Sequence, residues 1–276
     1  MIIYNDNILQ YKLYLHNLNM FSIKHSSISS CKLFFKQFNT IIDHTACIIN
    51  PYGFHVHSSN RKFGIFAILD NETFNHFICP KEVILQMSIK NINNMFSKHD
   101  TYHSLSIHYN GNNSILFTIN KNSTYSISCS LITNKKYIEN IKNVDDVDYH
   151  VEFEVQPKYI YSILKKIIDT KDENDSQNDN KNDIRATNIT IRADPDTQNI
   201  YIDTIKLNDS SLDTYHFVTP IQQVFCVDYV YQFIKNTLKN KYTSIEIGLY
   251  KNKSMKLQLY TNDYNYIELY IPPLKS

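Results

Sequence analysis

The sequence predicts an α+β protein built from two similar domains, each with two helices packed on antiparallel sheet. Three observations lead to this prediction. Segments of alternating apolar and polar residues, the pattern of half-buried strands, make up most of the chain. Four amphipathic segments of helical period interrupt them. The order strand, helix, strands, helix, strands occurs once before a polar connector and once after it.

We place the first domain at 20–132 and the second at 149–276, with a connector at 133–148 and an N-terminal extension at 1–19. In the second domain, the tract 170–184 has too few apolar side chains to offset the entropy of ordering its backbone. We expect it to be a flexible insert.

The first helix is predicted at 30–42, between strands near 21–25 and 45–49. Its apolar residues recur at helical spacing: Leu33, Phe34, Phe38 and Ile41. Lys32 and Lys36 fall on the opposite face, and Ser29 or Ser30 is placed to cap the first backbone N–H groups. The expected unit is strand, helix, strand.

Three more helices follow the same design, at 88–98, 157–169 and 226–241. Ser88 stands where an N-cap is expected, and Pro157 suits a first helical position. Each segment has an apolar stripe, of which Ile92 and Phe96, Ile160 and Leu164, and Val230 and Phe233 are members.

Composition excludes several protein classes. With 42% hydrophobic residues the chain can bury a substantial core, and none of its four glycines belongs to a nucleotide-binding phosphate loop. The five cysteines are scattered with no C-x-x-C pair, so we expect small core residues in a reducing compartment. No apolar run approaches the ~18 residues that span a bilayer, and the N-terminal segment is a poor secretory signal. We expect a soluble intracellular protein.

No catalytic residue, metal ligand or cofactor site stands out. His55 and His57 share one face of a strand, but a third metal ligand is not evident, so a solvated strand face is the favoured interpretation. Asp145, Asp146 and Asp148 lie in the connector and are interpreted as linker residues rather than nuclease ligands.

Charge is segregated along the chain. The four helical windows hold ten lysines against Asp169 and Asp228, a net charge of +8, whereas the whole chain carries +1. The remainder therefore carries −7. A basic bias shared by all four helices favours a common anionic partner, and a phosphate backbone bound without base specificity fits best.

This order of elements resembles the sliding DNA clamps from Phe21 to Leu274, outside the insert. Local motifs refine the resemblance. The segments 43–47 (DHTAC), 52–56 (YGFHV), 60–62 (NRK) and 73–77 (TFNHF) look most like the Rad-one subunit of the heterotrimeric DNA-damage checkpoint clamp. The ending 269–274 (LYIPPL) is similar to the Hus-one subunit, and proliferating cell nuclear antigen, the homotrimeric replication clamp, is the next match.

The resemblance implies a non-enzymatic subunit of a pseudo-six-fold ring around double-stranded DNA, in the nucleus. Its implied partners are two other clamp subunits, or copies of itself, a clamp loader, and clamp-binding peptides of repair or replication proteins; no membrane is implied. In related clamps, subunits join by strand addition, here by position between 123–132 and 200–207. Proline at Ile127 is expected to weaken that assembly.

The resemblance also implies two sets of site residues. The helix lysines expected to face DNA are Lys32, Lys36, Lys90, Lys98, Lys158, Lys165, Lys166, Lys235 and Lys239. A peptide-docking pocket beneath the connector would draw on Ile138, Ile141, Val144, Pro272 and Leu274. For these five, ordinary packing of a linker is a competing interpretation.

Two other function classes remain open from the sequence. A nuclease would need clustered carboxylates, which the chain offers only in the connector and the insert. A single-stranded nucleic-acid binder would use some of the 21 tyrosines and 15 phenylalanines, although most lie in strands where core packing is expected.

Overall fold

The structure, a computed structural model, describes residues 20–133, 149–175, 187–207, 212–240, 242–260 and 265–274. The N-terminal extension, nearly all of the connector and the end of the insert lie outside these residues. The described chain forms two compact units, one from 20–58 and 66–133 and the other from 59–65 and 149–274. The segment 59–65, which the sequence placed in the first domain, thus belongs to the second unit.

In the first unit, antiparallel strands follow the spatial order β4-β3-β2-β6-β9-β8-β7-β1-β5. Their bounds are β1 Phe21–His25, β2 His44–Asn50, β3 Gly53–Ser59, β4 Gly64–Asp70, β5 His76–Ile78, β6 Val83–Ser88, β7 Leu105–Tyr109, β8 Ser114–Ile119 and β9 Ser123–Leu131. A short 3-10 turn, η1, spans Asn71–Thr73. Strand β9 changes partner along its length, because Ser123–Ser128 pair with β8 and Cys129–Leu131 pair with β6.

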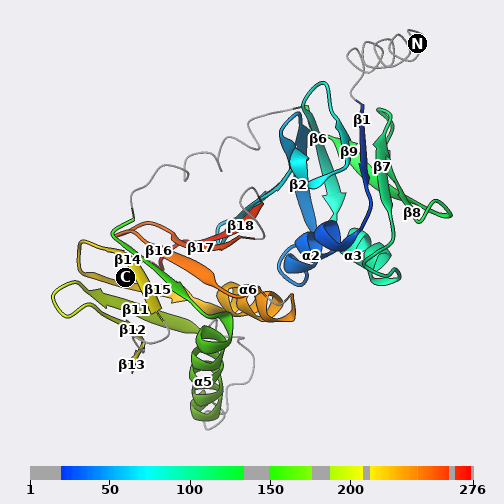
Figure 1. The fold of residues 1–276 in the computed structure, drawn as a ribbon. Coiled ribbons are helices and arrows are strands. Elements are labelled where there is room, and N and C mark those ends of the chain that lie inside the picture. Colours follow the sequence, from blue (N-terminus) through cyan, green and yellow to red (C-terminus); the bar gives the residue numbers. More distant parts are fainter. Residues whose placement is uncertain are drawn as a thin grey trace, which may run out of the picture. The chain divides into compact units, whose positions relative to one another are not determined.

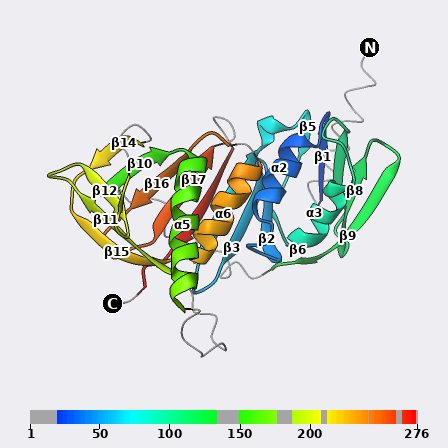
Figure 2. The ribbon, with the colours of Figure 1, turned by 90° about the horizontal axis from the view of Figure 1, so that it is seen from below.

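Helices α2 (Ser29–Gln37) and α3 (Ile89–Ser97) of the first unit lie side by side and cover one face of its strands (Figures 1 and 2). Phe34, Phe35 and Phe38 are buried beneath α2, and Ile92 and Phe96 beneath α3. The Ser88 side chain accepts a hydrogen bond from the Asn91 N–H, 3.2 Å, which confirms Ser88 as the N-cap of α3.

The second unit repeats the plan with two antiparallel sheets, ordered β14-β10-β16-β17-β18 and β13-β12-β11-β15. The strands are β10 Val151–Val155, β11 Asn188–Asp194, β12 Asn199–Ile202, β13 Ile205–Lys206, β14 Leu212–Phe217, β15 Ile221–Cys226, β16 Ile245–Leu249, β17 Met255–Tyr260 and β18 Tyr266–Ile271. Helices α5 (Pro157–Asp175) and α6 (Val227–Lys239) lie side by side (Figure 2). The α+β prediction of two similar domains, each with two helices on antiparallel sheet, is confirmed.

Several local predictions were wrong. In α2, Leu33 is 39% exposed and Phe35 is buried instead, because the face of the helix that meets the sheet is rotated relative to the predicted stripe. The residue preceding the helix is Ile28, and the Ser27 hydroxyl accepts from the Ser29 N–H at 3.1 Å, so neither Ser29 nor Ser30 is the N-cap.

In the second unit, α5 continues to Asp175, past the predicted start of the insert at 170. A helix already anchored by packing extends at little cost, since each added residue gains a backbone hydrogen bond without a new nucleation step. The segment 200–207, expected as one edge strand, is divided between β12 and β13 by a turn at Asp203, whose φ is +52°.

His55 and His57 do share one face of β3, but the face is not solvated. His57 is 4% exposed, and the Phe66 ring of β4 lies 4.5 Å from its ring, centroid to centroid. The cysteines behave as predicted: all five are free thiols, four are buried, and burial raises the pKa of Cys31 to about 12. Among the described residues, no helix is both long and apolar enough to cross a membrane.

Gly53 begins β3 where no other residue fits. Its φ is +154°, and a Cβ built there would collide with the Leu69 carbonyl oxygen and lie 3.0 Å from the Asp70 Cα. We expect Gly53→Ala to lower the free energy of unfolding by roughly 2 kcal/mol, measured by urea denaturation. Gly64→Ala is the control, because its nearest neighbour would be the Tyr270 Cβ at 3.7 Å. Equal stability of the two variants would contradict the steric argument.

Burial lowers the pKa of His55 below its ordinary 6.5, although the Glu82 and Asp70 carboxylates oppose the shift. The neutral ring is therefore favoured by folding, and its contribution to stability is complete above pH 6.5 and is lost as the pH falls below that value. We expect the thermal midpoint to drop less between about pH 7.5 and about pH 5.5 in His55→Gln than in the native chain. The same drop in both proteins would show that His55 does not contribute.

Candidate nucleic-acid interface

The outward face of the first helix pair is basic. Apolar residues hold α2 and α3 to the sheet, the Phe35 and Phe96 rings stack at 6.0 Å, and the Asn93 amide donates to the Phe35 carbonyl at 3.0 Å. The helix faces that point away from the core carry Lys36, Lys90 and Lys98, and all three lysines are exposed. The sequence prediction placed these lysines on exposed faces correctly.

Lys32 differs from its neighbours. It is half-buried, and its Nζ donates to the His99 carbonyl oxygen at 2.6 Å, just beyond the C-terminal end of α3. A cation there also interacts favourably with the carbonyl end of the helix dipole. Lys32 therefore joins the two helices in addition to contributing positive charge to the surface.

His99 was not singled out from the sequence, although it directly follows the predicted second helix. Its Nε2 lies 2.8 Å from the Tyr125 hydroxyl. Desolvation lowers the pKa of His99, and the positive charges of His103, Lys32 and Lys98 lower it further. The ring is therefore mainly neutral at pH 7, and it adds charge to this surface only in acid.

The second helix pair presents a larger basic surface. Lys158, Lys165 and Lys166 of α5 and Lys239 of α6 are exposed, and Lys235 is half-exposed. A shallow groove follows α5 and is lined by Lys158, Tyr161, Ser162, Lys165, Lys166, Asp169 and Thr170. Among the lining residues that the structure describes, Asp169 is the only carboxylate.

Two tyrosines join α5 to α6 within this surface. The Tyr161 and Tyr231 rings stack with centroids 5.2 Å apart and planes at 18°, and their hydroxyl oxygens are 2.9 Å apart. The Lys235 Nζ lies 5.9 Å from the centre of the Tyr231 ring. The sequence does not reveal this pairing, because the two residues stand 70 positions apart in the chain.

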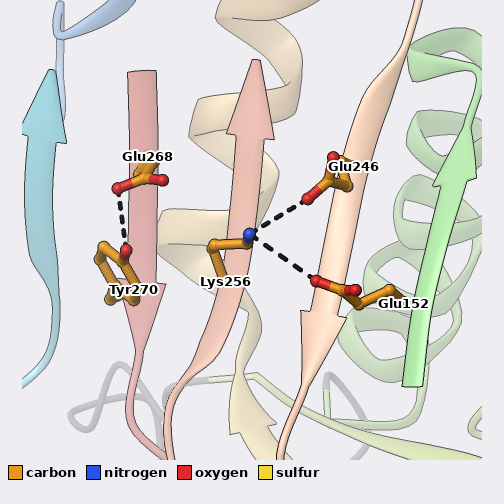
Figure 3. A network of polar contacts seen from close by, with 5 residues as sticks. All are labelled: Glu152, Glu246, Lys256, Glu268 and Tyr270. Carbon is orange, nitrogen blue, oxygen red and sulfur yellow. Dashed lines mark hydrogen bonds and ion pairs between the residues drawn. The ribbon is translucent and has the colours of Figure 1, made fainter. Parts of the chain in front are cut away.

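The opposite face of the second unit is acidic. Figure 3 shows Glu152, Glu246, Lys256, Glu268 and Tyr270 on the side of the strands away from the helices. The Lys256 Nζ lies 3.1 Å from a Glu246 carboxylate oxygen and 3.9 Å from one of Glu152, and the Tyr270 hydroxyl donates to Glu268 at 2.8 Å. Two carboxylates thus contact the Lys256 ammonium, and a third, that of Glu268, lies on the same side of the strands and accepts from Tyr270.

The pKa of Tyr260 is affected by these carboxylates. Its pKa is raised by burial first, and then by the negative charges of Glu246, Glu268 and Glu152. The second unit therefore carries positive charge on the 157–170 part of α5 and on α6, and negative charge on this part of its sheet, while the end of α5 adds the acidic residues Asp172, Glu173 and Asp175. Such a surface attracts a polyanion to the helices and repels it from the opposite side.

The predicted docking residues are divided between described and undescribed parts of the chain. Ile138, Ile141 and Val144 lie outside the described residues. Pro272 is half-buried and Leu274 is 41% exposed, with the Leu274 N–H donating to the Val224 carbonyl at 2.8 Å. The tail is thus fastened to β15, and the docking role stays a prediction. Within the described ranges, no group of three or more His, Cys, Asp or Glu residues could hold a metal ion.

The fold is similar to that of solved sliding clamps. Proliferating Cellular Nuclear Antigen from Entamoeba histolytica matches with a TM-score of 0.71 at 12% identity, over 92% of this chain and 99% of that one. A chain of the PCNA2–PCNA3 complex from Sulfolobus tokodaii matches with a TM-score of 0.69 at 14% identity, over 91% of this chain and 98% of that one. No family model and no curated protein sequence matches the chain. At these identities the likeness shows the fold.

We expect Lys32→Met to lower the free energy of unfolding by about 1 kcal/mol, because it removes a charged donor from a partly buried carbonyl. Lys36→Met is the matched control, since Lys36 is exposed on the same helix. Urea denaturation of both variants at neutral pH makes the comparison. Equal losses in the two variants would show that the Lys32 bond adds nothing to stability.

Proposed function

We propose that this chain is a subunit of a DNA sliding clamp, a non-enzymatic ring that stays on duplex DNA because it encircles it. The observation that carries the proposal is the pair of similar units, each covering its strands with two helices whose free faces carry lysines. The two-domain fold shared with solved clamps supports the same role. The excess of positive charge in the four sequence windows 30–42, 88–98, 157–169 and 226–241 supports it independently of the fold.

The helix lysines would meet the phosphate backbone. Exposed ammonium groups on flexible side chains attract phosphates without reading base edges, so contact is independent of sequence. Each single contact is weak, and a ring held by many of them can move along the duplex while topology prevents its escape. Bond-making chemistry has no part in this mechanism.

Ring closure would use the edge of β9. The Cys129 N–H donates to the Asn113 carbonyl at 2.9 Å, on the β8 side, and Ile127 pairs with Ile115 of that strand. Because backbone groups alternate direction along a strand, Thr124, Ser126 and Ser128 direct theirs to the other side. Among the described residues, that side is paired only beyond Ser128, where β6 begins to pair.

Two classes of clamp subunit fit the chain. The local motifs at 43–47, 52–56, 60–62 and 73–77 favour a subunit of the nuclear DNA-damage checkpoint clamp, with two different partner subunits, a loader and repair proteins as clients. The similarity to a proliferating cell nuclear antigen favours the homotrimeric replication clamp as the second candidate. The mass of the purified chain separates them, because a monomer fits the first and a self-closing trimer fits the second.

Charge reversal on the helices tests the proposal. We expect a variant carrying Lys36→Glu, Lys90→Glu and Lys98→Glu to bind duplex DNA more weakly, with the log–log salt slope reduced by roughly 0.9 for each phosphate that is no longer neutralised. Reversal of Lys158, Lys165 and Lys166 should act alike. Binding is followed by fluorescence anisotropy over a range of salt, and the weakening should be the same for any duplex sequence.

The matched control reverses Lys24, Lys81 and Lys251, which are exposed and lie outside the four helices. It changes net charge equally, so equal weakening in control and helix variants would contradict a helix-lined binding face. With the complete ring and its loader, loaded protein should leave linear DNA by its ends and persist on circles. Equal dissociation from both DNA forms would exclude a clamp.

A proline substitution in β9 tests ring closure. The pairing of the strand favours Ser126 for this test over Ile127, the position chosen from the sequence. The backbone of Ile127 pairs with β8, and its side chain is buried. Ile127→Pro would therefore disrupt the sheet within the unit itself. Ser126→Pro removes an outward N–H from an exposed residue and leaves the β8 ladder intact. We expect it to abolish assembly with the proper partner subunits in sedimentation experiments.

Circular dichroism provides the control for this variant. Ser126→Pro should keep a native spectrum and a thermal midpoint near that of the native chain, whereas Ile127→Pro should lose both. Normal assembly of the folded Ser126→Pro protein would exclude β9 as the joining edge.

A further inference from the structure

The Tyr161 and Tyr231 pair holds a hydrogen-bond donor in the middle of the basic surface of α5 and α6. Both side chains are half-exposed, and the helices that carry them lie side by side (Figure 2). The rings stack on each other, so the hydroxyls sit together, 2.9 Å apart.

The two hydroxyls have more donors than their mutual bond consumes. Each phenol has one O–H proton, and the bond between them uses one of the two. Whichever oxygen acts as donor in that bond, the other O–H remains available to an outside acceptor. No further hydrogen bond of either hydroxyl is found within the described part of the chain.

The Tyr231 hydroxyl keeps its proton at neutral pH. The pKa of Tyr231 is raised to about 12, chiefly by its hydrogen bond to Tyr161 and then by burial, with smaller effects of the Tyr161 and Asp169 charges. Tyr231 is therefore a neutral donor rather than a phenolate.

The surroundings select an anionic acceptor. Among the described side chains, Tyr161 lines the α5 groove together with Lys158, Lys165 and Lys166, against the carboxylate of Asp169. Lys235 approaches the Tyr231 ring from α6. Stacking covers one face of each ring, which reduces the aromatic area open to a base.

We propose that the Tyr161–Tyr231 pair donates a hydrogen bond to a phosphodiester oxygen of the duplex, which makes it a DNA-binding element distinct from the lysines. This inference rests on the proposed clamp function, because it takes duplex DNA as the partner of the helix face. The lysines provide attraction that depends on salt, whereas the hydroxyl pair provides a directional contact that does not release a counterion.

Because either hydroxyl can act as the outward donor, the single and double tyrosine variants should differ in DNA binding. Tyr161→Phe or Tyr231→Phe alone leaves one hydroxyl, which no longer has a tyrosine partner and can donate outward. Each single variant should therefore bind duplex DNA within about twofold of the native chain, and the double variant about fivefold more weakly. The salt slope should not change in any of the three.

The experiment measures fluorescence anisotropy of a labelled duplex with the full chain at several salt concentrations. Tyr102→Phe with Tyr260→Phe is the matched control, since both tyrosines are exposed and lie outside the helices. Thermal unfolding accompanies each measurement. The double variant should keep the native midpoint, because phenylalanine preserves the stacked rings.

Each outcome decides the matter. A double variant that binds like the native chain, while the lysine reversals still weaken binding, overturns the hydroxyl contact and leaves the clamp proposal standing. If the lysine reversals also have no effect, both fall. A lowered thermal midpoint or altered salt slope in the double variant, or single variants weakened as much as the double, assigns the pair a structural role and overturns the inference.

Discussion

The packing of paired helices against antiparallel strands is the interaction on which the rest of each unit depends. Phe34, Phe35 and Phe38 in one unit, and Phe233 and Ile234 in the other, become inaccessible only because strands cover them. Burying side chains of this size stabilises the fold by about 1.5 to 3 kcal/mol each. The same packing fixes the direction of the opposite helix faces, so lysines placed there have no alternative to the surface. Charge segregation in space is therefore a consequence of amphipathic packing.

The two sides of the sheet in the second unit differ in charge. Its helices carry five of the predicted lysines. On the other side of its sheet Lys256 contacts Glu246 and Glu152, and Glu268 accepts from Tyr270. The Lys256 side chain is only 12% exposed, and the Tyr149 ring lies 4.7 Å from its ammonium. The cation offsets part of the carboxylate repulsion without neutralising it. The sheet can then retain a negative surface at a tolerable cost in stability.

Strand β9 serves two structural purposes along its length. Its end is held by β6, and its earlier part is held by β8 on one side alone within the described residues. An edge of this kind can pair with another strand. Small polar residues such as Ser126 and Ser128 make it less prone to aggregation than an apolar edge would be. The alternation of backbone direction, rather than the location of the strand, determines which residues could join another subunit.

The sequence by itself determined the kinds of element and the exposure of most helix lysines. The 3.6-residue period, the Ser88 cap and the Pro157 start are local signals, and they locate α3 and α5 correctly. Only the tertiary structure decided that Phe35 rather than Leu33 is buried, that Phe66 covers His57, and that Lys32 bonds to the His99 carbonyl. It also brought Tyr161 to Tyr231, which stand 70 residues apart. These features depend on how a sheet orients its helices and on contacts between distant segments, and local periodicity contains no information about either.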